Sequence, residues 1–166
     1  MDKKQFITLL TSAQREYKNR IPIANFVLQN PDWIQLILER MFDVNDKNSV
    51  FSARILELTC KEELMVILPY IDEFVQLIPR LKLDGSIRAS AKIIELLCIE
   101  YFITFNTIYR DSLKNSHLEQ FTESCFDWMI TDKAIAIQAH SMYALYLLGF
   151  KVDWIHTELI ETINKH

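Results

Sequence analysis

A nine-residue segment recurs almost unchanged 38 residues along the chain, and this echo constrains the fold more than any other feature. Ser52–Cys60 reads SARILELTC and Ser90–Cys98 reads SAKIIELLC, with six of nine positions identical. A weaker third copy aligns Ala91 with Ala139, 48 residues further on. Self-similarity at such a period is typical of stacked helical repeats. We therefore expect an all-α chain built from repeated helix pairs.

The composition agrees with helices rather than strands. The chain has 166 residues, half of them hydrophobic, which suits one domain with a sizeable core. Only two glycines occur, and neither belongs to an Asn-Gly or Gly-Gly hairpin turn. We expect a single domain over 1–166, with repeated helices near 49–61, 86–105 and 133–148.

Prolines set several expected helix boundaries. An amphipathic helix is predicted from Lys3 to Lys18, with a break at Ile21-Pro22, because proline disfavours helix at the residue before it. Asn30-Pro31-Asp32 predicts a helix start. Pro69 and Pro79 predict a kink and then an end in the strongly apolar stretch before the second repeated helix.

Glycine and polar residues mark the remaining boundaries. Asp84-Gly85 predicts a turn, and Gly149 a left-handed helix C-terminus. Thr131-Asp132 is expected to cap the third repeated helix, and Asp153 to begin the last one. The polar stretch 106–116 is predicted to be a loop insertion, which accounts for the ten extra residues before the third copy.

The period, the helix pairing and the prolines in the first helix of a pair resemble HEAT-like, armadillo-type repeats. This resemblance implies a right-handed α-α superhelix, an α-solenoid. A second resemblance rests on four strings, NPDWIQLILERMFDVNDK, ILPYIDEF, SMYALYLLG and DWIHTEL. They resemble a family of short bacterial helical-repeat proteins whose members often carry the name adenylosuccinate lyase. Such chains continue with another helix, so this one is expected to be short or trimmed at its C-terminus.

The lyase name implies an enzyme, but no position of this chain matches a catalytic residue of adenylosuccinate lyases. Adenylosuccinate lyases hold a catalytic serine in a Gly/Ser-rich mobile loop near a Met-Pro-x-Lys-x-Asn motif. Neither glycine here lies in such a loop, and no Met-Pro occurs. We therefore predict no catalytic residue, and a chain that is not an enzyme.

The net charge and the cysteines indicate which partners and which cellular compartment are compatible with the sequence. The net charge is −4, and the basic residues Arg15, Lys18 and Arg20 are too few for a nucleic-acid footprint. Three cysteines without a CxxC motif or a secretory signal favour free thiols in a reducing, cytoplasmic setting. No apolar run is long enough for a membrane span.

Histidine and cysteine positions give no metal or cofactor signal. No HExxH occurs, and no two histidines are four residues apart, so we predict neither a metal site nor a cofactor. Cys60 and Cys98 are equivalent repeat positions and could form a redox pair, but two buried thiols are the favoured interpretation. Asp-Trp recurs at 32–33, 127–128 and 153–154. A surface row of tryptophans could bind a ligand, but inward packing of the tryptophans is the favoured interpretation.

A polar stripe on the repeated helices is the candidate partner-binding face. Repeat alignment makes Arg54, Lys92 and His140 equivalent, and likewise Glu57, Glu95 and Tyr143. In a HEAT-like stack the second helices line a concave surface, so these residues would form parallel rows. The competing interpretation is a solvated face with ion pairs three residues apart. The predicted face comprises Arg54, Glu57, Arg88, Lys92, Glu95, His140 and Tyr143.

These expectations rank three functions. A non-enzymatic scaffold that binds a protein or peptide on its concave face comes first. A lyase or another role in purine metabolism comes second, through the family label. A HEAT-like nucleic-acid binder comes third, because the acidic balance opposes it.

Overall fold

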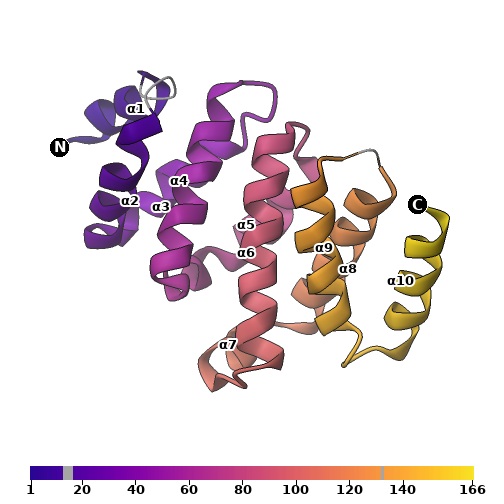
Figure 1. Cartoon of the computed structure of the whole chain (residues 1–166). Coiled ribbons are helices and arrows are strands. Elements are labelled where there is room, and N and C mark those ends of the chain that lie inside the picture. Colours follow the sequence, from indigo (N-terminus) through magenta and orange to yellow (C-terminus); the bar gives the residue numbers. More distant parts are fainter. Residues whose placement is uncertain (13–16, 132) are drawn as a thin grey trace. The chain divides into compact units, whose positions relative to one another are not determined.

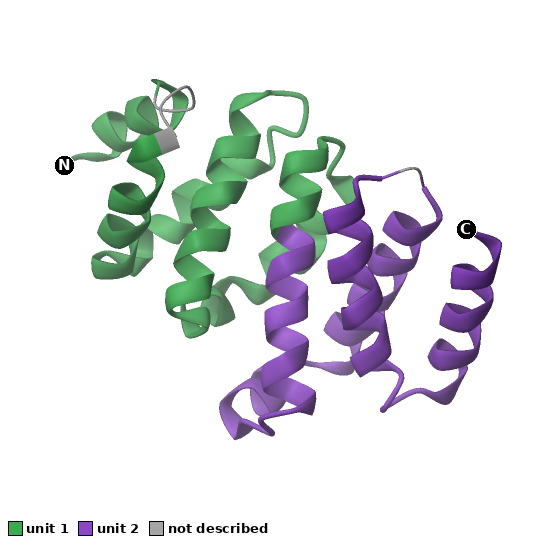
Figure 2. Cartoon of the chain, in the orientation of Figure 1, with its two compact units in different colours: residues 1–89 green, residues 90–166 purple. Residues whose placement is uncertain are grey.

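The computed structural model of the chain describes residues 1–12, 17–131 and 133–166, and these contain helices and no β-strand. The chain forms two compact units, Met1–Ala89 and Ser90–His166 (Figure 2). The boundary falls inside one helix, α6 (Asp84–Phe102), so each unit contains part of it. In the residues described, no helix is both long and apolar enough to span a membrane.

Unit 1 contains short helices around one longer helix. They are α1 (Lys3–Ser12), α2 (Arg20–Gln29), α3 (Ile34–Met41), α4 (Asn48–Glu62) and α5 (Ile71–Leu77), with 3₁₀ helices η2 (Tyr17–Asn19), η3 (Pro31–Trp33), η4 (Leu64–Tyr70) and η5 (Ile78–Arg80). Helix α4 packs against α1, α2, α3 and η4, so it forms the centre of this unit. Leu56, at its middle, is fully buried.

An aromatic cluster attaches α1 to the rest of unit 1. The Phe6 ring contacts Trp33 edge-on, with centroids 4.7 Å apart, and also contacts Phe26 at 5.8 Å. Phe6 is fully buried although α1 lies near the chain end. Edge-to-face aromatic pairs stabilise beyond the area that they bury, so this cluster fixes the N-terminal helix in place.

Unit 2 contains the rest of α6 followed by α7 (Thr107–Ser112), α8 (Asn115–Ile130), α9 (Ile135–Leu148) and α10 (Asp153–Lys165) (Figure 1). Helix α9 packs extensively against α8 and also against α10. The preceding-helix pairing expected from the repeat is present in both units, because α3 packs against α4 and α8 against α9.

The two copies of the repeated segment also share the same pattern of buried and partly exposed residues. At all nine aligned positions, Ser52–Cys60 in α4 and Ser90–Cys98 in α6 have the same degree of burial, and only the third and seventh positions of each are partly exposed. Leu56 and Ile94 occupy the same position in the two copies, and both are fully buried. The repeated sequence therefore specifies a repeated helix environment.

Three of the four proline predictions are confirmed and one is wrong. Pro31 begins η3, and α3 follows it directly. Pro69 lies in η4, a 3₁₀ stretch that ends at Tyr70, and Pro79 lies in η5 before the chain leaves the helix. Ile21-Pro22 does not break the chain, because α2 begins at Arg20 and includes it. Pro22 is in the first helical turn, where a backbone N–H would have no intrahelical partner.

Gly85 lies inside α6, so the turn predicted at Asp84-Gly85 is wrong. Gly149 follows the last residue of α9, as predicted, but its backbone is not left-handed. Neither has a positive φ, and Gly149 has φ −62°. Each is a site of close approach instead. A Cβ at Gly85 would collide with the Val50 side chain of α4, and one at Gly149 with the His156 ring of α10. The His156 Nε2 donates to the Tyr146 carbonyl oxygen at 2.7 Å and so satisfies the end of α9.

The remaining boundary predictions are partly corrected. The predicted loop 106–116 contains α7, which the Asn106 side chain caps by accepting from the Ile108 amide. The second repeated helix ends at Phe102 rather than 105, and Phe105 has a left-handed φ of 52°. The third begins at Ile135 rather than 133. The predicted cap residue Asp132 and the part of the first predicted helix at 13–16 lie outside the described residues.

Candidate functional site

In unit 1, three of the predicted site residues form one ion-pair cluster. The Glu57 carboxylate lies 2.5 Å from Arg54 on its own helix and 3.4 Å from Arg88 on α6. Glu57 is only 2% exposed, whereas 18% of the Arg54 side chain is exposed. The carboxylate therefore connects two helices from inside the protein.

Unit 2 repeats this arrangement with different cations. Glu95 accepts from Lys92 Nζ at 2.8 Å and pairs with His140 Nδ1 of α9 at 2.5 Å. Glu95 is 9% exposed, and about a fifth of the Lys92 and His140 side chains is exposed. The same glutamate position again connects a repeated helix to the next one.

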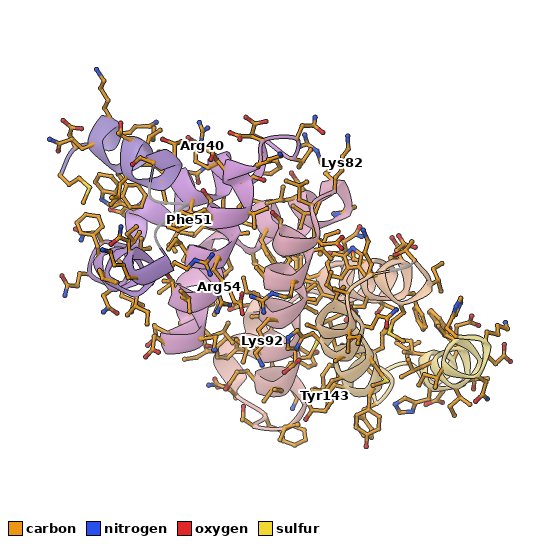
Figure 3. The ribbon with its side chains drawn as sticks, turned by 45° about the horizontal axis from the view of Figure 1, so that its top comes forward. Arg40, Phe51, Arg54, Lys82, Lys92 and Tyr143 are labelled. Atoms are coloured by element: carbon orange, nitrogen blue, oxygen red, sulfur yellow. The ribbon has the colours of Figure 1, made fainter. Side chains whose placement is uncertain are left out.

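The predicted stripe is thus divided by depth. Its two glutamates are buried and paired, which corrects the expectation that they face solvent, while Arg54, Lys92 and His140 remain at the surface. The pairs three residues apart do form, each between a buried carboxylate and a partly exposed cation. Tyr143 is 37% exposed on α9. Figure 3 labels Arg54, Lys92 and Tyr143, which belong to α4, α6 and α9 respectively.

Tyr143 belongs to an aromatic face that the sequence prediction did not include. Its ring stacks near that of Tyr146 at 6.4 Å, and Tyr146 contacts Phe150 at 5.1 Å. Tyr146 is 49% exposed. Together with α10 this face encloses a groove of about 560 Å³, the α9–α10 groove. It is lined by Met142, Tyr143, Tyr146, His156, Leu159, Ile160 and Ile163.

The repeat alignment shows what is unusual about this groove. Met142, Tyr143 and Tyr146 are exposed, whereas the residues that they replace in the second copy, Ile94, Glu95 and Cys98, are buried. The first copy agrees with the second, because Leu56, Glu57 and Cys60 are buried too. The signal for this site was present in the sequence, since Tyr146 aligns with a small buried cysteine.

His117 and the three cysteines lie outside this groove and are buried. The Lys114 amide donates to His117 Nδ1 at 3.0 Å, at the start of α8. Burial raises the pKa of the Cys125 thiol to about 12, and burial also raises the pKa values of Cys60 and Cys98. All three cysteines are free. Within the part of the chain that is described, no three His, Cys, Asp or Glu side chains are grouped to hold a metal ion.

Comparison of the chain with protein-family models, with curated proteins and with solved structures found no match. The geometry therefore defines the class on its own: an all-helical protein with repeated helix pairs and an exposed aromatic groove on its last repeated helix.

Proposed function

We propose that the chain is a non-enzymatic, HEAT-like helical-repeat protein that holds a helix of a partner protein in the α9–α10 groove. The observation that carries the proposal is the exposure of Met142, Tyr143 and Tyr146 at repeat positions that are buried in both earlier copies. Monomeric proteins rarely leave clustered large apolar side chains uncovered without an interaction to cover them.

The repeat also supports a helix as the occupant. Glu57 on α4 faces a cation on α6, and Glu95 on α6 faces His140 on α9, so this position points toward the next repeated helix. Tyr143 is the third member of that series. A partner helix seated here would take the place that a following repeated helix would occupy, which is how solenoid surfaces grow and bind.

The side chains fit an amphipathic helix with apolar residues three and four positions apart. Tyrosine is enriched among the residues that dominate binding energy, and apolar grooves accept such helices through a few anchors. His140 precedes Tyr143 by three residues on α9 and pairs with Glu95, which also accepts from Lys92. We therefore expect Tyr143→Ala to cost more affinity than Lys92→Ala, because edge charges mainly set association rate and salt dependence.

Selection from a displayed library of helical peptides tests the proposal directly. Enriched peptides should carry apolar residues at helical spacing, and Tyr146→Ala should weaken their binding, measured by fluorescence anisotropy, by about tenfold or more. Glu158→Gln is the matched control, because this exposed α10 residue lines neither groove of α10. No enrichment, or equal binding by Tyr146→Ala, would refute it.

Two further outcomes bear on the proposal. A concentration-dependent dimer that Tyr146→Ala abolishes would identify the helix as one from a second copy and would replace the partner-protein version. The non-enzymatic part predicts no fumarate release from adenylosuccinate, so turnover that a point substitution abolishes would overturn it.

Three free, buried thiols support a reducing, cytoplasmic setting as part of the proposal.

A further inference from the structure

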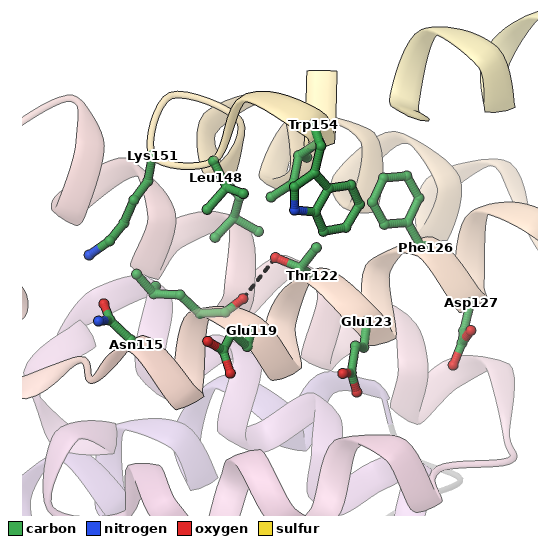
Figure 4. Close-up of a pocket in the computed structure, with 12 residues that line it drawn as sticks. Asn115, Glu119, Thr122, Glu123, Phe126, Asp127, Leu148, Lys151 and Trp154 are labelled. Atoms are coloured by element: carbon green, nitrogen blue, oxygen red, sulfur yellow. Dashed lines mark hydrogen bonds between the residues drawn. The ribbon is translucent and has the colours of Figure 1, made fainter. Parts of the chain in front are cut away.

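A second groove lies in unit 2, between α8 and the start of α10, and has a volume of about 770 Å³ (Figure 4). Its floor is apolar, formed by buried Leu118, Leu148 and Ile155. One wall is an aromatic pair, in which the Trp154 and Phe126 rings stack with centroids 5.9 Å apart and planes 19° from parallel. The α8–α10 groove is thus an apolar hollow with an aromatic wall.

Trp154 does not pack inward as its Asp-Trp sequence predicted. It is 57% exposed, whereas Trp128, the second member of that series, is 6% exposed. An indole with more than half of its surface in water loses most of the benefit of burial, so its position at the groove favours a role in contact with a ligand.

The groove has a strongly acidic rim. Glu119, Glu123 and Asp127 line it from α8 at successive intervals of four residues, and all three are exposed. None of them forms an ion pair with the residues that the structure describes. Like charges four residues apart on a helix repel one another, so this stripe destabilises α8 slightly while no cation is bound.

Among the described residues that line the groove, Lys151 is the only cation, and it does not pair with the carboxylates of the rim. Lys151 Nζ donates to the Tyr101 hydroxyl at 3.0 Å and lies 5.4 Å from the centre of that ring. Lys151 lies at the opposite end of the groove from Asp127 (Figure 4), and its ammonium group contacts Tyr101 rather than a carboxylate of the rim. The rim keeps an excess of negative charge.

We propose that the α8–α10 groove binds a basic peptide segment, with an apolar side chain on its floor and Lys or Arg side chains along the carboxylates. The aromatic wall suits such a segment too, because a cation is attracted to the face of an exposed tryptophan ring. Charge complementarity separates this occupant from others. An anionic ligand such as nucleic acid is repelled, and a second copy of this chain carries a net charge of −4.

Fluorescence anisotropy with two labelled peptides of equal length tests the proposal. One peptide alternates arginine with leucine, and the other has glutamine in place of every arginine. The basic peptide should bind more tightly, and its affinity should fall as salt is added, because exposed charges are screened. Equal binding of the two peptides would show that the rim does not select charge and would overturn the proposal.

Variants localise the binding to this groove. The triple variant Glu119→Gln, Glu123→Gln, Asp127→Asn should weaken the basic peptide by about tenfold or more and reduce the salt dependence. Trp154→Leu should weaken it as well, while Glu158→Gln, the exposed control on α10, should leave it unchanged. Wild-type affinity in the triple variant would place the peptide elsewhere and overturn the proposal.

Binding of the basic peptide to the α8–α10 groove can be distinguished from binding to the α9–α10 groove. Tyr146→Ala should leave the basic peptide bound, because Tyr146 does not line the α8–α10 groove. If Tyr146→Ala removes binding and Trp154→Leu does not, the basic segment belongs to the α9–α10 groove and this inference is wrong. A dimer that dissociates in Trp154→Leu would likewise replace the peptide with a second copy.

Discussion

Glu57 and Glu95 show how one residue type at one repeat position can stabilise two helix contacts. Each carboxylate is buried with a cation on its own helix and a second partner on the next repeated helix. Removal of one member of a buried ion pair leaves the other charge buried without a partner, and this lowers the free energy of unfolding strongly. Replacing the whole pair with apolar residues costs much less. These glutamates are therefore needed for stability even though they need not bind any partner.

We expect Glu57→Gln to lower the free energy of unfolding by about 3 kcal/mol, because two arginines would lose their carboxylate. Glu95→Gln should cost less, since Glu95 is more exposed and His140 is charged only when protonated. Urea denaturation at neutral pH measures both, with Glu158→Gln as the control. Equal losses at the two positions would show that the second partner is unimportant.

The three buried thiols make stability sensitive to alkaline pH. Their pKa values in the folded chain lie above 9.0, because burial disfavours the thiolate, while the unfolded chain has ordinary thiols. The thiol contribution to stability is therefore complete below pH 9.0. It is lost as pH rises further, because only the unfolded state releases these protons.

Urea denaturation between neutral pH and about pH 10 tests this dependence. The free energy of unfolding should fall above pH 9.0 in the native sequence, and less steeply in a variant with Cys60, Cys98 and Cys125 replaced by alanine. A thiol reagent should modify the native protein only as fast as it opens. Identical pH slopes for the two proteins would contradict the role of the thiols.

At the scale of the helix, the repeat supplies a set of three equivalent positions with different environments. Leu56 in α4 and Ile94 in α6 are fully buried, while Met142 in α9 is 40% exposed. Truncation of a buried Leu or Ile removes transfer energy and leaves a cavity, whereas an exposed side chain loses little.

Leu56→Ala and Ile94→Ala should each destabilise by about 2–5 kcal/mol, and Met142→Ala by less than about 1 kcal/mol. Thermal or urea unfolding of the three variants measures the difference. Met142→Ala is the matched control, because it makes a comparable truncation at the same repeat position. A large loss at Met142 would mean that its face is covered in solution, as a stable dimer through the α9–α10 groove would require.

The helices that the sequence predicts well are those whose environment follows from their own periodicity. The burial of Ser52–Cys60 repeats at Ser90–Cys98 because apolar spacing along a helix selects the buried face locally. The turn predicted at Gly85 and the left-handed backbone predicted at Gly149 were wrong, because a glycine needed for close approach looks the same in sequence, and only the Val50 and His156 side chains reveal it. Trp154 and Tyr146 were missed because exposure depends on whether another element covers them.

Helix α10 is a second example of a helix whose exposed residues could not be predicted from its own sequence. Ile155 and Leu159 are buried, while Trp154 lines one groove and Ile160 and Ile163 line the other. Apolar residues thus occur on more than one side of a single helix. A helix with that pattern is usually buried all round, and its exposure in unit 2 is the feature from which both binding proposals start.

At the scale of the whole molecule, the chain has two compact units but no linker between them. The boundary at Ala89 and Ser90 falls within α6, whose helix continues across it. Helix formation is cooperative, and short isolated helices are only marginally stable in water. If either unit unfolded alone, the part of α6 left in the other unit would lose its continuation, so each unit depends on the folded state of the other.

We therefore expect both units to unfold in one transition. Trp33 reports on unit 1 and Trp128 on unit 2, so two variants that each keep only one of these tryptophans, with phenylalanine at the others, give separate probes. In each variant the urea midpoint from fluorescence should equal the midpoint from the helix signal in circular dichroism. Phenylalanine at Trp33 perturbs the cluster with Phe6, so the circular dichroism curve of each variant serves as its own reference. A fluorescence midpoint that differs from the circular dichroism midpoint of the same variant would show that α6 breaks at the boundary, and that the two units are independent folding domains.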